Sequence, residues 1–207
     1  MLTSNTLADF LNETASNSPA PGGGSVSALV ASLGFALVSM VCRLTIGKKK
    51  YADVQAEMEG VLKQSEESRL AATRIIDEDT EAFNKVMTAF SLPKDSEQQK
   101  TLRAESIQEA TKAATLVPLR LAQLCAEGMA LARVAAEKGN ANSLSDAGVA
   151  ASMIAAACEG AAMNVKINLG GLADKIFVGV VSEEISSYLD IVRPAAASIL
   201  SLVNSKI

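Results

Sequence analysis

Two long segments of this 207-residue chain carry almost no charge, and they limit the folds that the chain can adopt. Residues Val26 to Cys42 contain no charged side chain, and residues Leu144 to Leu169 are rich in alanine and nearly uncharged. Such segments are either membrane spans or fully buried helices. The first is at the lower limit for a span, and its serines dilute its apolar character. We therefore predict two buried helices in a protein that does not enter a membrane.

The remaining chain has the apolar spacing of helices and lacks the alternation of half-buried strands. One short helix is expected over Thr6–Ala15, with Leu7, Phe10 and Leu11 facing the core. Ser25 is expected to cap the first apolar helix, and Gly47 is expected to end it. Ser96 and Gln99 are expected to form a capping box. Pro118 is expected to kink a helix or to open a new one. The predicted helices cover Thr6–Ala15, Ser25–Ile46, Asp53–Phe90, Ser96–Lys138, Leu144–Leu169, Asp174–Ile191 and Pro194–Val203.

These patterns predict one all-α domain over residues 1–207, a helical bundle whose two long apolar helices are buried. Two such helices in so small a bundle also indicate a dimer interface. A non-enzymatic helical adaptor has the same patterns and remains a lesser alternative.

The composition excludes several classes of function. There is no histidine, which removes the commonest general base and most zinc sites, and no metal site is expected. The net charge of −4 argues against nucleic-acid binding. Cys42, Cys125 and Cys158 form no CxxC pair, and the first residues have no basic region typical of a secretory signal. A cytoplasmic location is therefore predicted.

A glycine-rich turn precedes the first apolar helix. Gly22, Gly23 and Gly24 lead into Ser25, and glycines let a ligand approach the backbone closely. Free N–H groups at a helix start attract carboxylates or phosphates. No GK[ST] follows and no strand precedes, so this turn is neither a P-loop nor a dinucleotide fingerprint. It is either a ligand-binding turn or a flexible loop before a helix.

Charged residues gather at two further places. Lys48, Lys49 and Lys50 follow the first apolar helix, where they either cap its negative end or bind a polyanionic tail. Asp79 lies at the edge of the apolar side of the next helix, where a carboxyl group can acquire a raised pKa and transfer protons. An ordinary charged helix surface is the alternative for Asp79.

Polar residues also flank and interrupt the second apolar helix. Asn140, Asn142, Ser145 and Asp146 surround its start, and Asn164 and Asn168 share one face near its end. Amides on an apolar helix need hydrogen-bond partners, which either a heterocyclic ligand or a neighbouring helix supplies.

These elements, in this order, resemble the cyclodeaminase/cyclohydrolase family. The matching stretches are Pro21–Ser25, Lys48–Tyr51, Asp79–Phe83 with Leu92–Lys94, Asn140–Asp146 and Asn164–Leu169. The resemblance covers the chain from about Leu7 to Leu169. It implies an all-helical enzyme that acts on tetrahydrofolate derivatives as a homodimer or a higher homo-oligomer, without a separate cofactor.

Two reactions fit this resemblance. The first is cyclodeamination of 5-formimidoyltetrahydrofolate to 5,10-methenyltetrahydrofolate and ammonia, and we place it first. The alternative is hydrolysis of 5,10-methenyltetrahydrofolate to 10-formyltetrahydrofolate. By this resemblance Asp146 is the principal acid/base, and Asp79 is either its partner or an electrostatic stabiliser of the cationic product. The asparagines Asn140, Asn142, Asn164 and Asn168 bind the amide edge of the pterin, and Ser145 is a further substrate-binding residue. The glycine turn, Gly22 to Gly24 with Ser25, and Lys48, Lys49 and Lys50 bind the glutamyl carboxylates. The reverse assignment of the two ends of the substrate is the alternative.

Overall fold

Six α-helices and three short 3-10 helices make up the fold, and there is no strand. The computed structural model describes all residues, Met1–Ile207. The elements are η1 (Leu2–Ser4), α1 (Leu7–Thr14), α2 (Gly23–Thr45), η2 (Lys49–Val54), α3 (Gln55–Phe90), α4 (Glu97–Lys138), η3 (Ala141–Ser143), α5 (Leu144–Leu169) and α6 (Lys175–Asn204). The predicted all-α class is confirmed.

Helix ends follow the predicted signals at some places and depart from them at others. Ser96 and Gln99 form the reciprocal capping box that opens α4, and Gly47 takes a positive φ of 78° after α2. The predicted N-cap at Ser25 is wrong, because α2 begins at Gly23 and Ser25 is buried inside its first turn. The predicted break before Pro194 is also wrong. Buried residues on both sides of that proline keep α6 packed as one helix.

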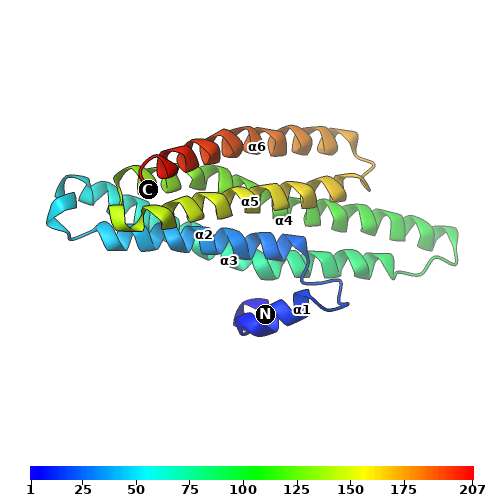
Figure 1. Ribbon diagram of the computed structural model, residues 1–207. Helices are drawn as coiled ribbons and strands as arrows, with labels where there is room; N and C mark the ends of the chain where they lie inside the picture. Colours follow the sequence, from blue (N-terminus) through cyan, green and yellow to red (C-terminus); the bar gives the residue numbers. More distant parts are fainter.

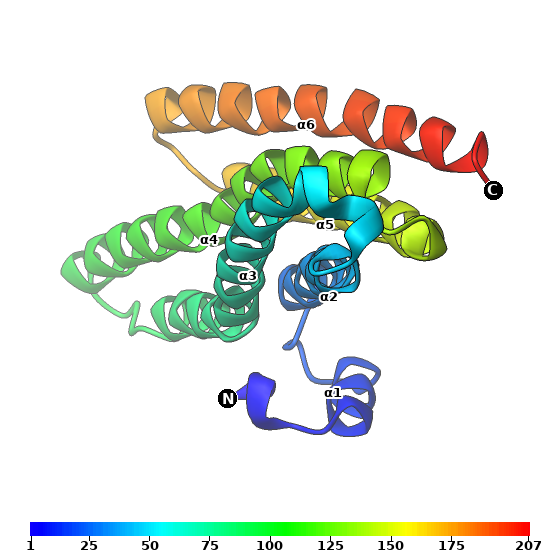
Figure 2. The same cartoon turned by 90° about the vertical axis from the view of Figure 1, so that its left-hand side faces the viewer.

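The apolar helices α2 and α5 lie side by side in the bundle. The long hairpin of α3 and α4 packs behind them, and α6 covers α4 and α5 (Figures 1 and 2). Small residues let these axes approach closely. A Cβ atom added at Gly34 of α2 would lie 2.8 Å from Cγ1 of Ile154 and 3.2 Å from the carbonyl oxygen of Ala150, both on α5. The ring of Phe35, fully buried, lies directly against Gly128 of α4.

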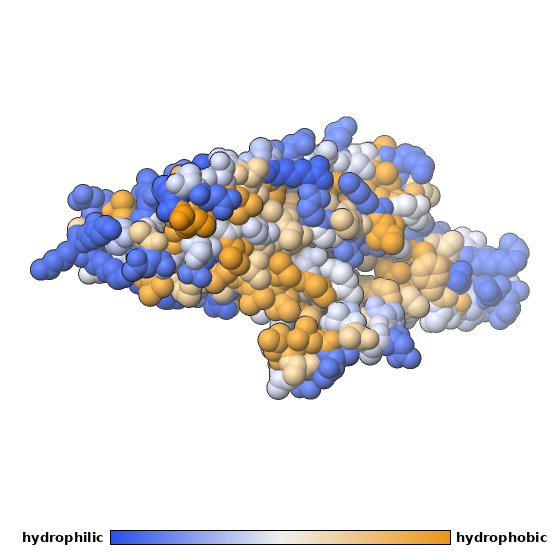
Figure 3. Space-filling view, viewed as in Figure 1, coloured by the Kyte–Doolittle hydropathy of each residue, from blue (hydrophilic) through white to orange (hydrophobic).

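One side of the α2 and α5 pair is apolar and uncovered, and we call it the α2–α5 face. Its residues are all partly or fully exposed and follow each other at alternating spacings of four and three. On α2 they are Val26, Val30, Leu33, Leu37, Met40 and Leu44. On α5 they are Val149, Met153, Ala156, Gly160, Met163 and Ile167. Figure 3 shows apolar side chains across this side of the molecule. The 3-4 spacing is that of a helix seam which packs against another helix.

Helices α2 and α5 are also long and apolar enough to cross a membrane by length and composition alone. More than half of the apolar window of α2 and half of that of α5 are buried inside the fold, so each helix packs in the core along one side.

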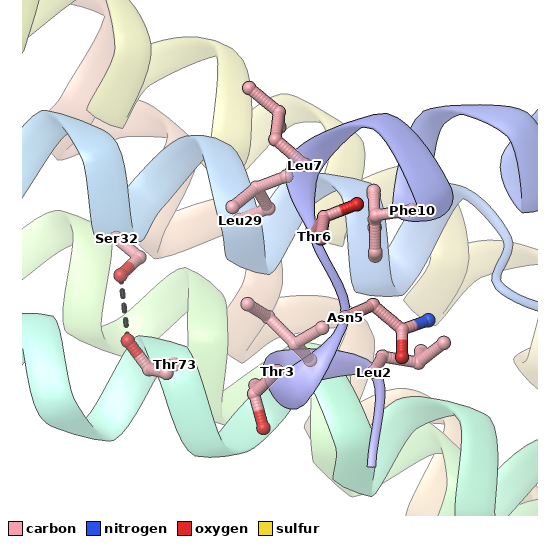
Figure 4. Close-up of a pocket in the computed structure, with 10 residues that line it drawn as sticks. Leu2, Thr3, Asn5, Thr6, Leu7, Phe10, Leu29, Ser32 and Thr73 are labelled. Atoms are coloured by element: carbon pink, nitrogen blue, oxygen red, sulfur yellow. Dashed lines mark hydrogen bonds between the residues drawn. The ribbon is translucent and has the colours of Figure 1, made fainter.

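The N-terminal residues form an arm that lies across α2 and α3. The carboxyl group of Asp77 on α3 accepts hydrogen bonds from the Leu2 N–H and from the Thr3 hydroxyl, the latter at 2.6 Å. Between arm and bundle lies a cavity of about 240 Å³, bordered by Phe10, Leu29 and the hydrogen-bonded pair Ser32 and Thr73 (Figure 4). Phe10 is buried as predicted. Leu7 and Leu11 are 67 % and 56 % exposed, because α1 meets the bundle along one narrow edge.

Candidate active site

A cavity of about 340 Å³ lies at the N-terminal end of α2, where four segments of the chain meet. The glycine turn forms one wall, α3 contributes the opposite wall, and the last turns of α5 with one residue of α4 complete it. Its lining residues are Pro19, Ala20, Gly22, Gly23, Gly24, Asp79, Thr80, Phe83, Val86, Ala114, Asn164, Ile167 and Asn168. The predicted residues Gly22, Gly23, Gly24, Asp79, Asn164 and Asn168 are thus brought together.

The carboxyl group of Asp79 lies directly against the backbone of α2 at Gly24. A Cβ atom at position 24 would overlap the carboxyl oxygens of Asp79, so only glycine allows this approach. Ser25 is fully buried beneath the carboxyl group. Its hydroxyl lies 2.8 Å from the Ile76 carbonyl oxygen and 3.1 Å from Oδ2 of Asp79. Ser25 therefore does not line the cavity, and it contacts Asp79 in place of the substrate contact predicted for it.

Opposing effects act on the pKa of Asp79. Burial disfavours the charged form and raises the pKa above its ordinary value. Hydrogen bonds from the hydroxyl and the backbone N–H of Ser25 favour the charged form and act in the opposite direction. Burial is the larger effect. Asp79 is therefore a carboxyl group that can both accept and donate a proton closer to neutral pH than an exposed aspartate can.

The two asparagines of α5 point their hydrogen-bonding groups toward the cavity from one helix face. Nδ2 of Asn164 donates to the Gly160 carbonyl oxygen at 2.8 Å, and Nδ2 of Asn168 donates to the Ala114 carbonyl oxygen at 3.2 Å. These bonds fix both amide planes. Neither Oδ1 atom receives a hydrogen bond from the chain, so both remain available to N–H groups of a ligand.

Charge in this cavity comes from one residue. Asp79 is the only ionisable side chain in its lining, and no lysine or arginine contributes. Phe83 and Val86 supply an apolar wall suited to the flat face of a ring. A ligand that is cationic or rich in N–H donors matches this lining better than a polyanion does.

The other predicted site residues lie at the opposite end of the α2 and α5 pair. Lys48, Lys49 and Lys50 are exposed beyond the C-terminus of α2, about 33 Å along that helix from the glycine turn. Asn142 and Ser145 are exposed and Asp146 is half-buried at the start of α5, with Asp146 about 27 Å along the helix from Asn164. Within one chain, the predicted pairing of Asp146 with Asp79 at a single reacting centre is therefore wrong.

Asn140 also differs from its predicted role. It is buried, its Nδ2 donates to the Leu44 carbonyl oxygen at 3.0 Å, and its Oδ1 accepts the Asn142 N–H at 3.2 Å. Its amide therefore joins η3 to the end of α2, and it does not reach the Asp79 cavity.

Thr80 and Ile167 line the cavity and were not predicted. Thr80 lies next to Asp79 in the chain, and its hydroxyl is 3.1 Å from that of Ser25. Ile167 is 77 % exposed although it borders Asn164 and Asn168. Proximity to a predicted residue was the only available signal for either. No group of three or more Asp, Glu, Cys or His side chains is placed to hold a metal ion.

The profile of the formiminotransferase-cyclodeaminase family matches residues 6–187. This chain belongs to that family. A methenyltetrahydrofolate cyclohydrolase of Methylorubrum extorquens is 45 % identical to this chain. The alignment covers 98 % of this chain and 97 % of the Methylorubrum extorquens protein. The formimidoyltransferase-cyclodeaminase of Mus musculus is 34 % identical over 97 % of the chain, which spans only 37 % of that longer protein.

A solved structure of the family has the same fold. The formiminotetrahydrofolate cyclodeaminase of Thermotoga maritima superposes with a TM-score of 0.90 at 30 % identity, over 99 % of this chain and 98 % of that one. These relatives carry the names of two different enzymes, so the fold and family are common to both reactions.

Proposed function

We propose that this protein is a methenyltetrahydrofolate cyclohydrolase, which converts 5,10-methenyltetrahydrofolate and water to 10-formyltetrahydrofolate and a proton. The observation that carries this proposal is the cavity in which Asp79 is the only ionisable side chain. The full-length similarity at 45 % identity to a protein of that name supports it. The bridging carbon of the substrate lies in a cationic N–CH–N group, which suits a site with one carboxyl group and no lysine or arginine.

The proposed mechanism uses Asp79 first as a base and then as an acid. Its carboxylate accepts a proton from a water molecule as the water oxygen bonds to the methenyl carbon. The bond between N5 and that carbon then breaks while N5 takes a proton from Asp79. The hydroxyl proton of the adduct leaves to solvent, and the formyl group remains on N10. Positioned acid/base groups of this kind contribute about 10²- to 10⁴-fold to a rate.

The neighbouring residues orient the substrate in this proposal. Oδ1 of Asn164 and Oδ1 of Asn168 accept N–H groups of the pterin ring, and Phe83 packs against the ring face. The backbone at Gly23 and Gly24 lets the ring approach closely. The steps move only protons and one water molecule, so we propose no separate cofactor. We place the enzyme in the cytoplasm, where its three buried free thiols stay reduced.

Cyclodeamination of 5-formimidoyltetrahydrofolate is the second candidate, although the sequence had placed it first. The name of the Thermotoga maritima structure favours it. There N10 attacks the formimidoyl carbon, ammonia leaves, and the methenyl bridge forms. Asp79 would accept the N10 proton and return it to the leaving nitrogen, which takes one further proton from solvent before it departs as ammonia. We place hydrolysis before cyclodeamination because the relative at 45 % identity is named for hydrolysis, while the bifunctional relatives are 30–35 % identical.

The experiment compares both substrates by the absorbance of the methenyl group. We expect the purified protein to consume 5,10-methenyltetrahydrofolate faster than the spontaneous reaction and to produce none of it from 5-formimidoyltetrahydrofolate. Asp79→Asn should lower the hydrolytic rate about 10²- to 10⁴-fold, whereas Asp95→Asn, at an exposed position beyond α3, should not. Turnover of the formimidoyl compound alone would establish the second candidate. Inertness toward both would refute the proposed enzyme.

A further inference from the structure

The N-terminal arm is joined to the bundle by very few polar interactions. Its only hydrogen bonds to other elements are the two that the carboxyl group of Asp77 accepts, from the Leu2 N–H and from the Thr3 hydroxyl, the latter at 2.6 Å. We call this pair of bonds the latch. All other hydrogen bonds of residues 1–21 stay within that segment. The buried side chain of Phe10 adds an apolar contact, so the polar attachment of the arm depends on one carboxyl group.

The chain between the arm and α2 forms part of the Asp79 cavity. We call residues 15–21 the strap, and two of them, Pro19 and Ala20, line that cavity. The strap makes no hydrogen bond to α3, α4 or α5. Figures 1 and 2 show it as the link from α1 to the start of α2. The position of the strap is therefore set by its two ends, the arm on one side and α2 on the other.

The latch lies within one helical turn of the substrate cavity. Asp77 and Thr80 are three residues apart on α3 and share one face of that helix. Both border a second cavity, of about 350 Å³, whose other wall includes Leu2 of the arm. Thr80 also lines the Asp79 cavity. The latch thus fixes the arm to the turn of α3 that carries the site, so the strap and Asp79 keep a defined relative position while the latch is closed.

We propose that Asp77 is a positioning residue for the reaction, because it latches the arm to α3 and thereby holds Pro19 and Ala20 in the wall of the substrate cavity. Asp77 does not line that cavity and acts only through the strap. The role of the wall in binding substrate rests on the proposed function. With the latch closed, the wall is already in place when the substrate arrives. With the latch open, the strap has more conformations, and the substrate must order it on binding.

The kinetic test compares three variants. Asp77→Ala removes both bonds of the latch and leaves Asp79 in place. We expect its KM to rise about three- to tenfold, the effect of losing one or two methylene-sized contacts, while kcat stays within about twofold of the wild type. Asp77→Asn offers Oδ1 to the Leu2 N–H and Nδ2 to the Thr3 hydroxyl oxygen, so it should restore most of the wild-type KM. Asp95→Ala, at an exposed position beyond α3, should leave KM unchanged.

A displacement of Asp79 through α3 is the competing explanation, since Asp77 and Asp79 are two residues apart. Thr3→Val opens half of the latch from the arm and leaves α3 unchanged, and it tests the latch even where Asp77→Ala does not fold. Its KM should rise by a smaller factor than that of Asp77→Ala. The acidic limb of the pH profile of kcat should stay in place in both variants, because Asp79 keeps its contacts with Gly24 and Ser25. A shifted limb in Asp77→Ala, or an unchanged KM in Thr3→Val, would overturn the proposal.

The motion of the strap can be measured without a folate. A nitroxide label on Asn17→Cys, at an exposed position of the strap, is selective because the three native cysteines are buried. Its electron paramagnetic resonance spectrum should show greater mobility when Asp77→Ala is added, and wild-type mobility when Asp77→Asn is added. A raised KM without greater mobility, or greater mobility with an unchanged KM, would overturn the proposal. Mobility that depends on Asp77 in a protein inert toward both folates would refute the proposed function and leave the latch standing.

Discussion

At the scale of single residues, the candidate site depends on how Asp79 is held. Its half-buried carboxyl group packs against Gly24 and Ser25, and this partial burial raises its pKa. A carboxyl group with a raised pKa in the folded state contributes stability at acid pH, and this contribution is lost as the pH rises through the folded pKa. Above that pKa the ionised Asp79 therefore lowers stability, so in that pH range Asp79→Asn should fold at least as well as the wild type.

The pH dependence of catalysis should report this carboxyl group. If ionised Asp79 is the base, kcat/KM falls as the pH drops through its pKa, and the fall begins at a higher pH than for an exposed aspartate. Ser25→Ala removes a hydrogen bond that favours the ionised form, so the acidic limb should move to higher pH. Pre-steady-state and steady-state pH profiles would measure the shift.

Ser25→Thr, which keeps a hydroxyl, is the matched control for that profile. A limb that moves equally in both variants would indicate a packing effect. A limb that moves to lower pH in Ser25→Ala would show that the Ser25 hydroxyl mainly accepts a hydrogen bond from the protonated carboxyl group of Asp79.

Single residues could be predicted where their chemistry was local. The glycine turn, Asp79, Asn164 and Asn168 were named from residue type and neighbours, and they do meet. The close contact between Gly24 and Asp79 could not be predicted, because most of α2, η2 and most of α3 separate the two residues in the chain. Asn140 looked like a ligand residue, but its amide is used within the chain, and only the structure shows its partners.

At the scale of helices, propensity and capping signals predicted most of the fold. The capping box at Ser96 and the positive φ at Gly47 depend only on neighbouring residues, so the sequence alone could predict these two helix ends. Prolines were less informative. Pro118 and Pro194 both lie inside continuous helices, because burial of their neighbours outweighs the loss of one hydrogen bond. Whether a proline ends a helix depends on packing that the local pattern does not contain.

The contact between α2 and α5 gives a prediction on helix packing. A Cβ atom at Gly34 would lie 2.8 Å from the Ile154 side chain and 3.2 Å from the Ala150 backbone, which cannot move away freely. Gly34→Ala should therefore lower the free energy of unfolding by about 1–3 kcal/mol. At Gly60 of α3 nothing lies within 4 Å of an added Cβ atom, so Gly60→Ala should raise it by about 1 kcal/mol. Urea denaturation measures both, and equal effects would contradict the close packing.

At the scale of the whole molecule, the separation of the predicted site residues has a structural cause. Helices α2 and α5 run antiparallel, so the start of each lies beside the end of the other. Ser145 and Asp146 lie at the start of α5 and Asn164 lies near its end, so these predicted site residues are separated by most of the length of the helix. The sequence could predict the helices and their polar ends. It could not show which ends meet, because that depends on the relative directions of helices that are far apart in the sequence.

The N-terminal arm gives a prediction about the coupling of a peripheral segment to the bundle. Asp77 is buried and accepts hydrogen bonds from Leu2 and Thr3, while Leu7 and Leu11 on α1 stay exposed. Asp77→Ala removes both bonds. The freed N–H and hydroxyl can turn to water, so the arm should detach while the bundle remains folded. We expect amide hydrogen exchange to rise over residues 2–14 with little change in α2 and α5. Thr3→Val, which removes one bond, should give a smaller rise. Faster exchange throughout the bundle in Asp77→Ala would contradict the prediction, because it would show that Asp77 stabilises the whole bundle.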